Sequence, residues 1–130
     1  IQKNQILSCH DISEGGMITA IFEMCVGGDI GTELHLEGVV SQHLRGGRMD
    51  SSKVKRPDYF LFNETAGCFI VELENETIAK SIFKNIPFII LGKTQKEKNI
   101  TVKQKNKKLF EEKIDVLKRV WQEPMRKIFG

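Results

Sequence analysis

The sequence of 130 residues has only three prolines, three cysteines and one tryptophan, and it contains no long apolar run. A membrane-spanning helix needs about 20 mostly apolar residues, so the missing run excludes a helical membrane protein. The N-terminus lacks the charged and apolar regions of a signal peptide, which favours the cytoplasm as the location. Without low-complexity segments, the composition is that of one ordinary globular domain.

The three cysteines, Cys9, Cys25 and Cys68, form no C-x-x-C pair. An odd number without this spacing argues against both a disulfide framework and a structural zinc site. All three lie among apolar residues, so we expect small buried hydrophobic side chains rather than catalytic thiols. The histidines His35 and His43 have no carboxylate or cysteine partners at metal-ligand spacing, and we expect no metal site.

The net charge of +3 is too small to predict binding to nucleic acid. Seven lysines lie between Lys93 and Lys108 with a single glutamate, Glu97, and further basic residues lie between positions 45 and 56. Such runs usually form a solvated face, and no aromatic residues are interleaved for base stacking. We therefore expect no nucleic-acid partner, with a small basic module that binds nucleic acid or protein as an alternative.

Hydrophobic periodicity predicts about six strands and three or four helices. Short apolar or alternating segments predict strands at residues 5–9, 32–36, 59–62, 68–73, 86–91 and 100–104, the last two forming a hairpin. Helical spacing predicts helices at residues 17–26, at 76–84 and from 110 to a break at Pro124, with a short helix afterwards.

These elements show no strict strand–helix–strand alternation. Their order predicts an α+β fold with a mixed, mostly antiparallel sheet flanked by the helices. Residues 37–58 contain three glycines and a proline without sustained periodicity. A segment of this length without regular structure is usually functional or disordered, and we expect a mobile loop there.

The turn between the first strand and the first helix is the strongest local signal. It reads His10, Asp11, Ile12, Ser13, Glu14, Gly15, Gly16. Ser13 is expected to cap the helix with Glu14 in its first turn. Paired glycines also let backbone amides approach an anion, and a helix N-terminus favours phosphate. The Walker and G-x-G-x-x-G patterns are absent. The residues alone leave two interpretations open, a tight capped turn and a phosphate site.

A second polar turn, Asn63, Glu64 and Thr65, lies between two predicted strands. Its carboxylate would suit a ligand hydroxyl or a metal, although a single carboxylate is weak evidence. The His10–Asp11 pair lacks the further ligands that a metal-dependent phosphohydrolase needs, and no G-x-S-x-G nucleophile elbow is present. We therefore expect no catalytic residue in this chain.

Two segments together resemble a known family. Residues 10–28 (HDISEGGMITAIFEMCVGG) and residues 61–72 (LFNETAGCFIVE) are similar in order and pattern to the C-terminal domain of the AIR synthase-related superfamily. Within it, the sequence most resembles the last domain of phosphoribosylformylglycinamidine synthase of the large-subunit type. The resemblance covers most of the chain, except for the 37–58 loop and the lysine-rich tail.

The resemblance implies that residues 1–130 form a single domain from a longer enzyme of purine biosynthesis. Such a ligase uses ATP and glutamine-derived ammonia to convert formylglycinamide ribonucleotide to the amidine. ATP and Mg²⁺ would be bound mainly by other domains, with no cofactor required by this one, and the isolated fragment would be inactive. The implied partners are the remaining domains of the enzyme, a glutaminase and small accessory subunits, and exposed apolar surface would allow the fragment to form a homodimer.

The resemblance also implies where ligands would bind. A phosphate or nucleotide would contact residues of the glycine turn, and a second set of contacts would come from the polar turn: His10, Asp11, Ser13, Gly15 and Gly16, then Asn63, Glu64 and Thr65. We expect both turns to face one cleft that binds an anion weakly.

The polar turn departs from the family's usual Ser-Glu-Ser, and Cys68 stands where arginine is common. These differences imply a degenerate, structural site. Related enzymes are alternatives: aminoimidazole ribonucleotide synthetase, selenophosphate synthetase, thiamine-monophosphate kinase and the hydrogenase-maturation dehydratase.

Overall fold

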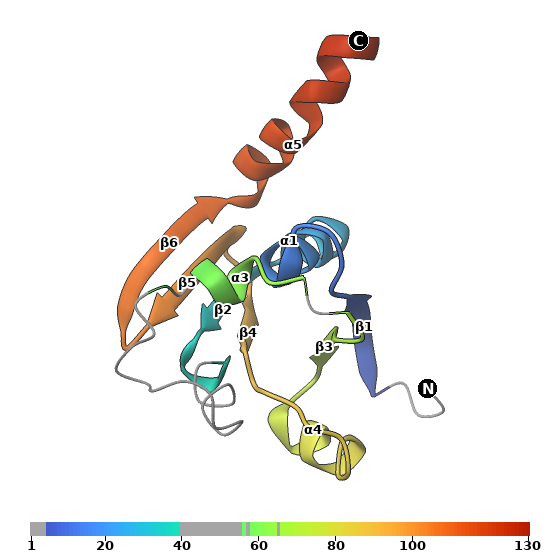
Figure 1. Cartoon of the computed structure of the whole chain (residues 1–130), viewed down its shortest axis with the longest axis vertical. Coiled ribbons are helices and arrows are strands. Elements are labelled where there is room, and N and C mark those ends of the chain that lie inside the picture. Colours follow the sequence, from blue (N-terminus) through green and yellow to red (C-terminus); the bar gives the residue numbers. More distant parts are fainter. Residues whose placement is uncertain (1–4, 40–55, 57, 65) are drawn as a thin grey trace.

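The computed structural model describes residues 5–39, 56, 58–64 and 66–130. Most of the expected 37–58 loop, and Thr65 of the polar turn, lie outside the described residues. The elements follow in the order β1 (Ile6–Asp11), α1 (Gly16–Gly28), β2 (Gly31–His35), α3 (Asp58–Leu61), β3 (Phe69–Leu73), α4 (Glu76–Ile82), β4 (Gly92–Gln95), β5 (Asn99–Gln104), β6 (Lys107–Lys113) and α5 (Ile114–Phe129) (Figure 1). This content confirms the predicted α+β class.

The strands are divided between two sheets. β1 and β3 form an antiparallel pair, and the other strands form a four-stranded sheet in the order β4-β2-β5-β6. Within the larger sheet only the contact of β2 with β5 is parallel, so the predicted mixed, mostly antiparallel pairing is confirmed. α1 lies between the two sheets, and α5 projects from the body of the domain (Figure 1).

The core forms where α1 packs against the larger sheet. Met17, Ile21 and Cys25 are buried at a spacing of four residues, which places them on one face of the helix. Leu34 and Leu36 are buried in the same cluster, as the alternation of residues 32–36 predicts. This packing fixes the start of α1 relative to the strands. In the described part of the chain, no helix is long and apolar enough to cross a membrane.

Two predicted strands are wrong. Residues 59–62 belong mostly to helix α3, where Phe60 and Leu61 are buried in the core and Asp58 occupies the first turn. Packing against α1 therefore outweighs the aromatic β propensity of this segment. Residues 86–91 are irregular, and strand β4 begins at Gly92. The predicted hairpin is also absent, because β4 and β5 lie on opposite sides of β2.

The C-terminal helix that was predicted from residue 110 to Pro124 differs from the structure at both ends. Phe110 lies in β6, which forms a hairpin with β5, and α5 begins only at Ile114. The hairpin turn places Lys105 and Asn106 at positive φ angles of 47° and 62°, as a type I′ turn requires, without the Asn-Gly signal typical of that turn. Pro124 lies inside α5 instead of ending it. A proline removes one backbone hydrogen bond, which this exposed part of the helix tolerates because water can reach the freed carbonyl group.

The prediction that all three cysteines are buried is correct only for Cys25. Its side chain is 3% exposed, whereas Cys9 and Cys68 are exposed, and all three are free thiols. Burial, with a smaller effect of Glu72, raises the pKa of the Cys25 thiol to about 11. Cys25 is therefore a protonated, inaccessible thiol at neutral pH, and thiolates are the reactive form.

We expect Ellman's reagent to modify two thiols in the native chain, Cys9 and Cys68, and a third only after unfolding in guanidinium chloride. Burial and a raised pKa both slow the reaction of Cys25. In a Cys25→Ala variant the slow thiol should disappear while the two fast ones stay. Three fast thiols in the native protein would contradict this assignment.

Candidate functional site

The glycine turn connects β1 to α1 through a tight reversal of the backbone. The Gly16 N–H donates to the carbonyl oxygen of Ser13 at 3.1 Å, and Gly15 has φ 81° and ψ −1°. These angles are those of the third residue of a type II turn, which needs glycine. Gly15 is the N-cap of α1, so the predictions that Ser13 caps the helix and that Glu14 lies in its first turn are wrong. The turn places both residues ahead of the helix.

Gly16 lies against the end of α3. Its φ is +74°, and a Cβ atom added there would lie 2.6 Å from the carbonyl carbon of Phe62 and 2.9 Å from the carbonyl oxygen of Leu61. Real Cβ atoms do not approach backbone atoms this closely. Glycine is therefore needed here both for the backbone angle and for the close approach of the two segments.

The polar turn lies beside the glycine turn because β1 and β3 pair directly. Asp11 is opposite Phe69 in the antiparallel register, and the Ile12 N–H donates to the carbonyl oxygen of Cys68 at 2.9 Å. Across this junction the Gly15 N–H donates to Glu64 Oε1 at 2.9 Å. The structure thus brings the two predicted turns into contact.

An open pocket of about 490 Å³ lies between the two turns. The described residues that line it are Asp11, Ile12, Ser13, Glu14, Glu64, Ala66, Gly67 and Phe69. Of the described residues expected to bind ligand, Asp11, Ser13 and Glu64 are in this lining, whereas His10, Gly15, Gly16 and Asn63 are not. The sequence did not single out Phe69 as a pocket residue; it is the first residue of β3, and its side chain is exposed.

His10 connects β1 to α1. Its Nε2 lies 2.9 Å from a carboxylate oxygen of Glu23 in α1, and its Nδ1 donates to the carbonyl oxygen of Asp11 at 2.7 Å. The same Nδ1 also lies 3.5 Å from a carboxylate oxygen of Asp11. Both ring nitrogens are engaged, which makes His10 a positioning residue for α1.

The charge of the pocket does not fit a phosphate group. Among the described residues that line it, three carry carboxylates, Asp11, Glu14 and Glu64, and none is lysine or arginine. The Glu64 carboxylate already accepts a hydrogen bond from the N–H of Gly15, the N-cap of α1, which is where an anion would bind. Over the described ranges, no group of three or more His, Cys, Asp or Glu side chains is placed to hold a metal ion. The described residues of the pocket therefore do not fit an ATP–Mg²⁺ site.

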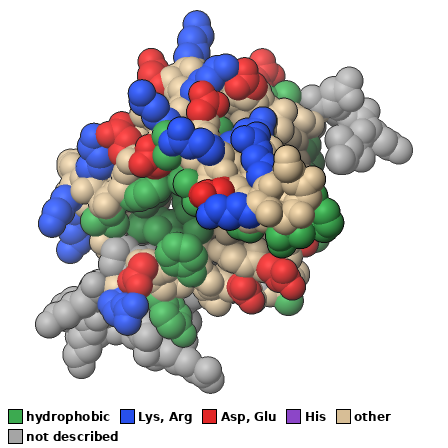
Figure 2. Space-filling model, turned by 90° about the horizontal axis from the view of Figure 1, so that it is seen from above, with side chains coloured by type: hydrophobic (Ala, Val, Ile, Leu, Met, Phe, Trp, Pro, Cys, Tyr) green, Lys and Arg blue, Asp and Glu red, His purple; other side chains and the backbone are tan. Residues whose placement is uncertain are grey.

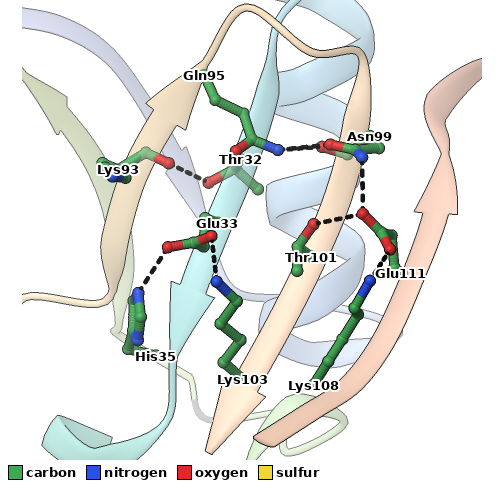
Figure 3. Close-up of polar contacts among 10 residues, drawn as sticks. All are labelled: Thr32, Glu33, His35, Lys93, Gln95, Asn99, Thr101, Lys103, Lys108 and Glu111. Carbon is green, nitrogen blue, oxygen red and sulfur yellow. Dashed lines mark hydrogen bonds and ion pairs between the residues drawn. The ribbon is translucent and has the colours of Figure 1, made fainter. Parts of the chain in front are cut away.

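A second polar cluster lies on the four-stranded sheet (Figure 3). Glu33 accepts from Lys103 Nζ at 2.6 Å and lies 3.0 Å from His35 Nε2, and its side chain is 19% exposed. Lys103, and then His35, hold the pKa of the Glu33 carboxyl below its usual range. His35 was expected to lack a carboxylate partner at metal-ligand spacing; it pairs with Glu33 instead, because residues two apart in a strand share a face. Both carboxylate oxygens of Glu33 are engaged, so the cluster joins β2 to β5.

The comparisons with known proteins identify the family and its range. The model of the family described as "AIR synthase related protein, C-terminal domain" matches residues 1–105. The subunit PurL of phosphoribosylformylglycinamidine synthase from Aquifex aeolicus is 26% identical over 132 residues, covering 98% of this chain and 16% of that protein. The "probable tegument protein antigen 3" of Alcelaphine herpesvirus 1 is 28% identical over 123 residues, covering 92% of this chain and 8% of that protein. The chain thus spans less than a fifth of the length of these relatives.

A solved structure shows the same fold. The "Structure of PurLQS from Thermotoga maritima" superposes with a TM-score of 0.65 at 18% identity, over 89% of this chain and 19% of that one. The family model covers well over half of this chain, including both turns that form the pocket. The chain therefore belongs to the family of AIR synthase related protein C-terminal domains.

Proposed function

We propose that this chain is the last domain of a phosphoribosylformylglycinamidine synthase of the large-subunit type. The full enzyme would be a ligase of purine biosynthesis that forms the amidine from formylglycinamide ribonucleotide, ATP and glutamine-derived ammonia. The observation that carries the proposal is the contact between the two family motifs, made by the Gly15 N–H and Glu64 Oε1 at 2.9 Å. The relative from Aquifex aeolicus, which matches almost the whole chain, supports this choice over the related enzymes.

Within that enzyme the domain has a structural role. The described residues that line its pocket include no basic side chain, and this acidic lining does not suit a nucleotide. ATP and Mg²⁺ are bound by other domains, and this domain requires no cofactor of its own. The Glu64 side chain and the Ser13 carbonyl group hold the glycine turn in place, and the two turns together are a degenerate form of a ligand site.

Exposed apolar side chains support packing against other parts of a larger protein. The outer half of α5 carries a group of side chains that are each more than half exposed: Val120, Trp121, Met125, Ile128 and Phe129. Hydrophobic side chains also gather around a hollow on the face seen from above, with charged side chains around them (Figure 2). Exposed apolar surface of this kind usually marks an interface. The partners in the proposal are the other domains, a glutaminase and small accessory subunits in the cytoplasm.

A chimera tests the proposal. This chain would replace the matching region of the Aquifex aeolicus subunit, and ATP-dependent amidine formation would be measured with ammonia as the nitrogen source. We expect activity within about tenfold of the parent, and no activity from a subunit that lacks the region, because the domain supports the fold of the others. A chimera that folds and is inactive would contradict the proposal.

The isolated chain is expected to form no amidine from formylglycinamide ribonucleotide, ATP and ammonia. Its pocket has neither a metal cluster nor a basic group to stabilise a phosphoryl intermediate, as far as the described residues extend. The measurement is ADP release coupled to product detection, with the parent Aquifex aeolicus subunit as a positive control. Turnover above the background without enzyme would show that the domain has its own catalytic site. Tight, salt-sensitive binding to RNA would instead support the basic-module alternative.

A further inference from the structure

We propose that the Glu64 carboxylate is a built-in anion at the start of α1 and keeps phosphate groups out of the glycine turn. Glu64 Oε1 accepts from the Gly15 N–H at 2.9 Å, across 49 residues of sequence. Gly15 is the N-cap of a 13-residue helix, and an anion at such a terminus is stabilised by the amide and by the helix dipole. The inference rests on the proposed function for its choice of phosphate as the relevant ligand.

The rest of the turn is closed to an anion as well. The Gly16 N–H is committed to the carbonyl oxygen of Ser13 at 3.1 Å, so it is not presented to the pocket. Thr19 Oγ1 donates to the carbonyl oxygen of Gly15 at 2.9 Å and holds the other side of the same peptide segment. A phosphate cradle depends on several backbone amides that point at one ligand. In this turn the two glycine amides instead have partners from the protein.

The charges around Glu64 favour its role as a permanent occupant. Asp11 and Glu14 line the same pocket, and a phosphate entering beside them would meet three carboxylates. The imidazole of His10 is shared between Asp11, 3.5 Å from Nδ1, and Glu23 on α1, 2.9 Å from Nε2, and neither contact involves Glu14 or Glu64. Like charges repel, and because Asp11, Glu14 and Glu64 are all exposed, water screens this repulsion and it adds only modestly to the effect of the occupied amide. A dianionic phosphate therefore gains less at this position than the carboxylate that already occupies it.

Backbone structure holds Glu64 in this position. The pairing of Asp11 with Phe69, and the hydrogen bond from the Ile12 N–H to the Cys68 carbonyl oxygen, fix the end of the turn that follows Glu64. Gly67 has φ +80°, which lets the chain reverse just before β3. On the other side, α3 ends at Leu61 and packs into the core. The Glu64 carboxylate is thus held beside Gly15 by β3 on one side and α3 on the other.

The test follows the backbone amide of Gly15 by NMR in ¹⁵N-labelled chain during titration with inorganic phosphate and with ADP. In the native protein we expect no saturable change at Gly15 up to millimolar ligand. In a Glu64→Ala variant we expect the Gly15 resonance to move and saturate, with an affinity for phosphate at least tenfold above that of the native chain. The matched control is Glu14→Ala, which removes a carboxylate from the same pocket and leaves the Gly15 hydrogen bond in place.

Three results would overturn the proposal: saturable binding at Gly15 in the native chain, no gain of phosphate binding in folded Glu64→Ala, or an equal gain in Glu14→Ala. Hydrogen exchange in the native chain provides a measurement that needs no variant. If Glu64 accepts the hydrogen bond from the Gly15 N–H, this amide should exchange slowly, and phosphate should not change its rate. Exchange as fast as in an unstructured peptide would refute the proposal. Failure here is separate from failure of the proposed function, because the chimera is judged by amidine formation.

Discussion

Replacing Gly16 with alanine is expected to lower the free energy of unfolding by about 3 kcal/mol or more. The φ angle of +74° is unfavourable for a residue with a Cβ atom, and that atom would lie 2.6 Å from the carbonyl carbon of Phe62. Both obstacles come from the backbone, so no change of rotamer relieves them. α3 would have to move away from α1, and the buried contacts of Leu61 would be weakened with it. Urea unfolding followed by circular dichroism measures the change.

Gly27 in the same helix provides the matched control. A Cβ atom there has nothing within 4 Å, so the substitution Gly27→Ala creates no contact. Alanine has the higher helix propensity and restricts the unfolded chain, which should stabilise the protein by about 0.5–1 kcal/mol. The two variants carry the same chemical change in one helix and should shift stability in opposite directions. Equal effects would show that Gly16 is not limited by its backbone position.

The place of the glycine turn in the fold could be predicted from local sequence, and its contact with the polar turn could not. The residues from His10 to Gly16 run from the end of strand β1 through a turn to the start of helix α1. The order of apolar, polar and glycine residues in this short segment is enough to predict the turn. The register of β1 with β3 then brings Glu64 to Gly15 across 49 residues. No local pattern indicates that this carboxylate takes the amide that a phosphate would use. In our proposal, the hydrogen bond from the Gly15 N–H to Glu64 determines whether an anion can bind at the turn.

The errors in the fold have the same physical origin. Residues 59–62 have strand-forming aromatic residues, but the burial of Phe60 and Leu61 against α1 makes them helical. The β5–β6 hairpin was missed because Lys105 and Asn106 adopt positive φ angles without a glycine to indicate them. In both places, tertiary contacts supply energy that exceeds the local preference, which is typically below about 1 kcal/mol per residue. The alternating segment 32–36 was predicted correctly because its local pattern and its burial agree.

Leu36→Ala is expected to lower the free energy of unfolding by about 2–5 kcal/mol, the usual range for a fully buried leucine. Leu36 is 0% exposed, and it belongs to the core cluster with Leu34, Ile100 and Val102. Its N–H donates to the carbonyl oxygen of Lys103 at 3.0 Å, which holds the backbone beside β5 after β2 has ended. The backbone is therefore unable to collapse freely into the space left by the side chain, and we expect a loss in the upper part of the range.

The control for this cavity is Leu7→Ala on β1, which removes the same atoms from a side chain that is 58% exposed. It should change the free energy of unfolding by less than about 1 kcal/mol. Urea unfolding of both variants, with unchanged dependence on denaturant, measures the difference directly. If Leu36→Ala were no more destabilising than Leu7→Ala, the segment after β2 would not be part of the core. The sheet that supports α1, and with it the contact of Gly15 with Glu64, would then need another source of stability.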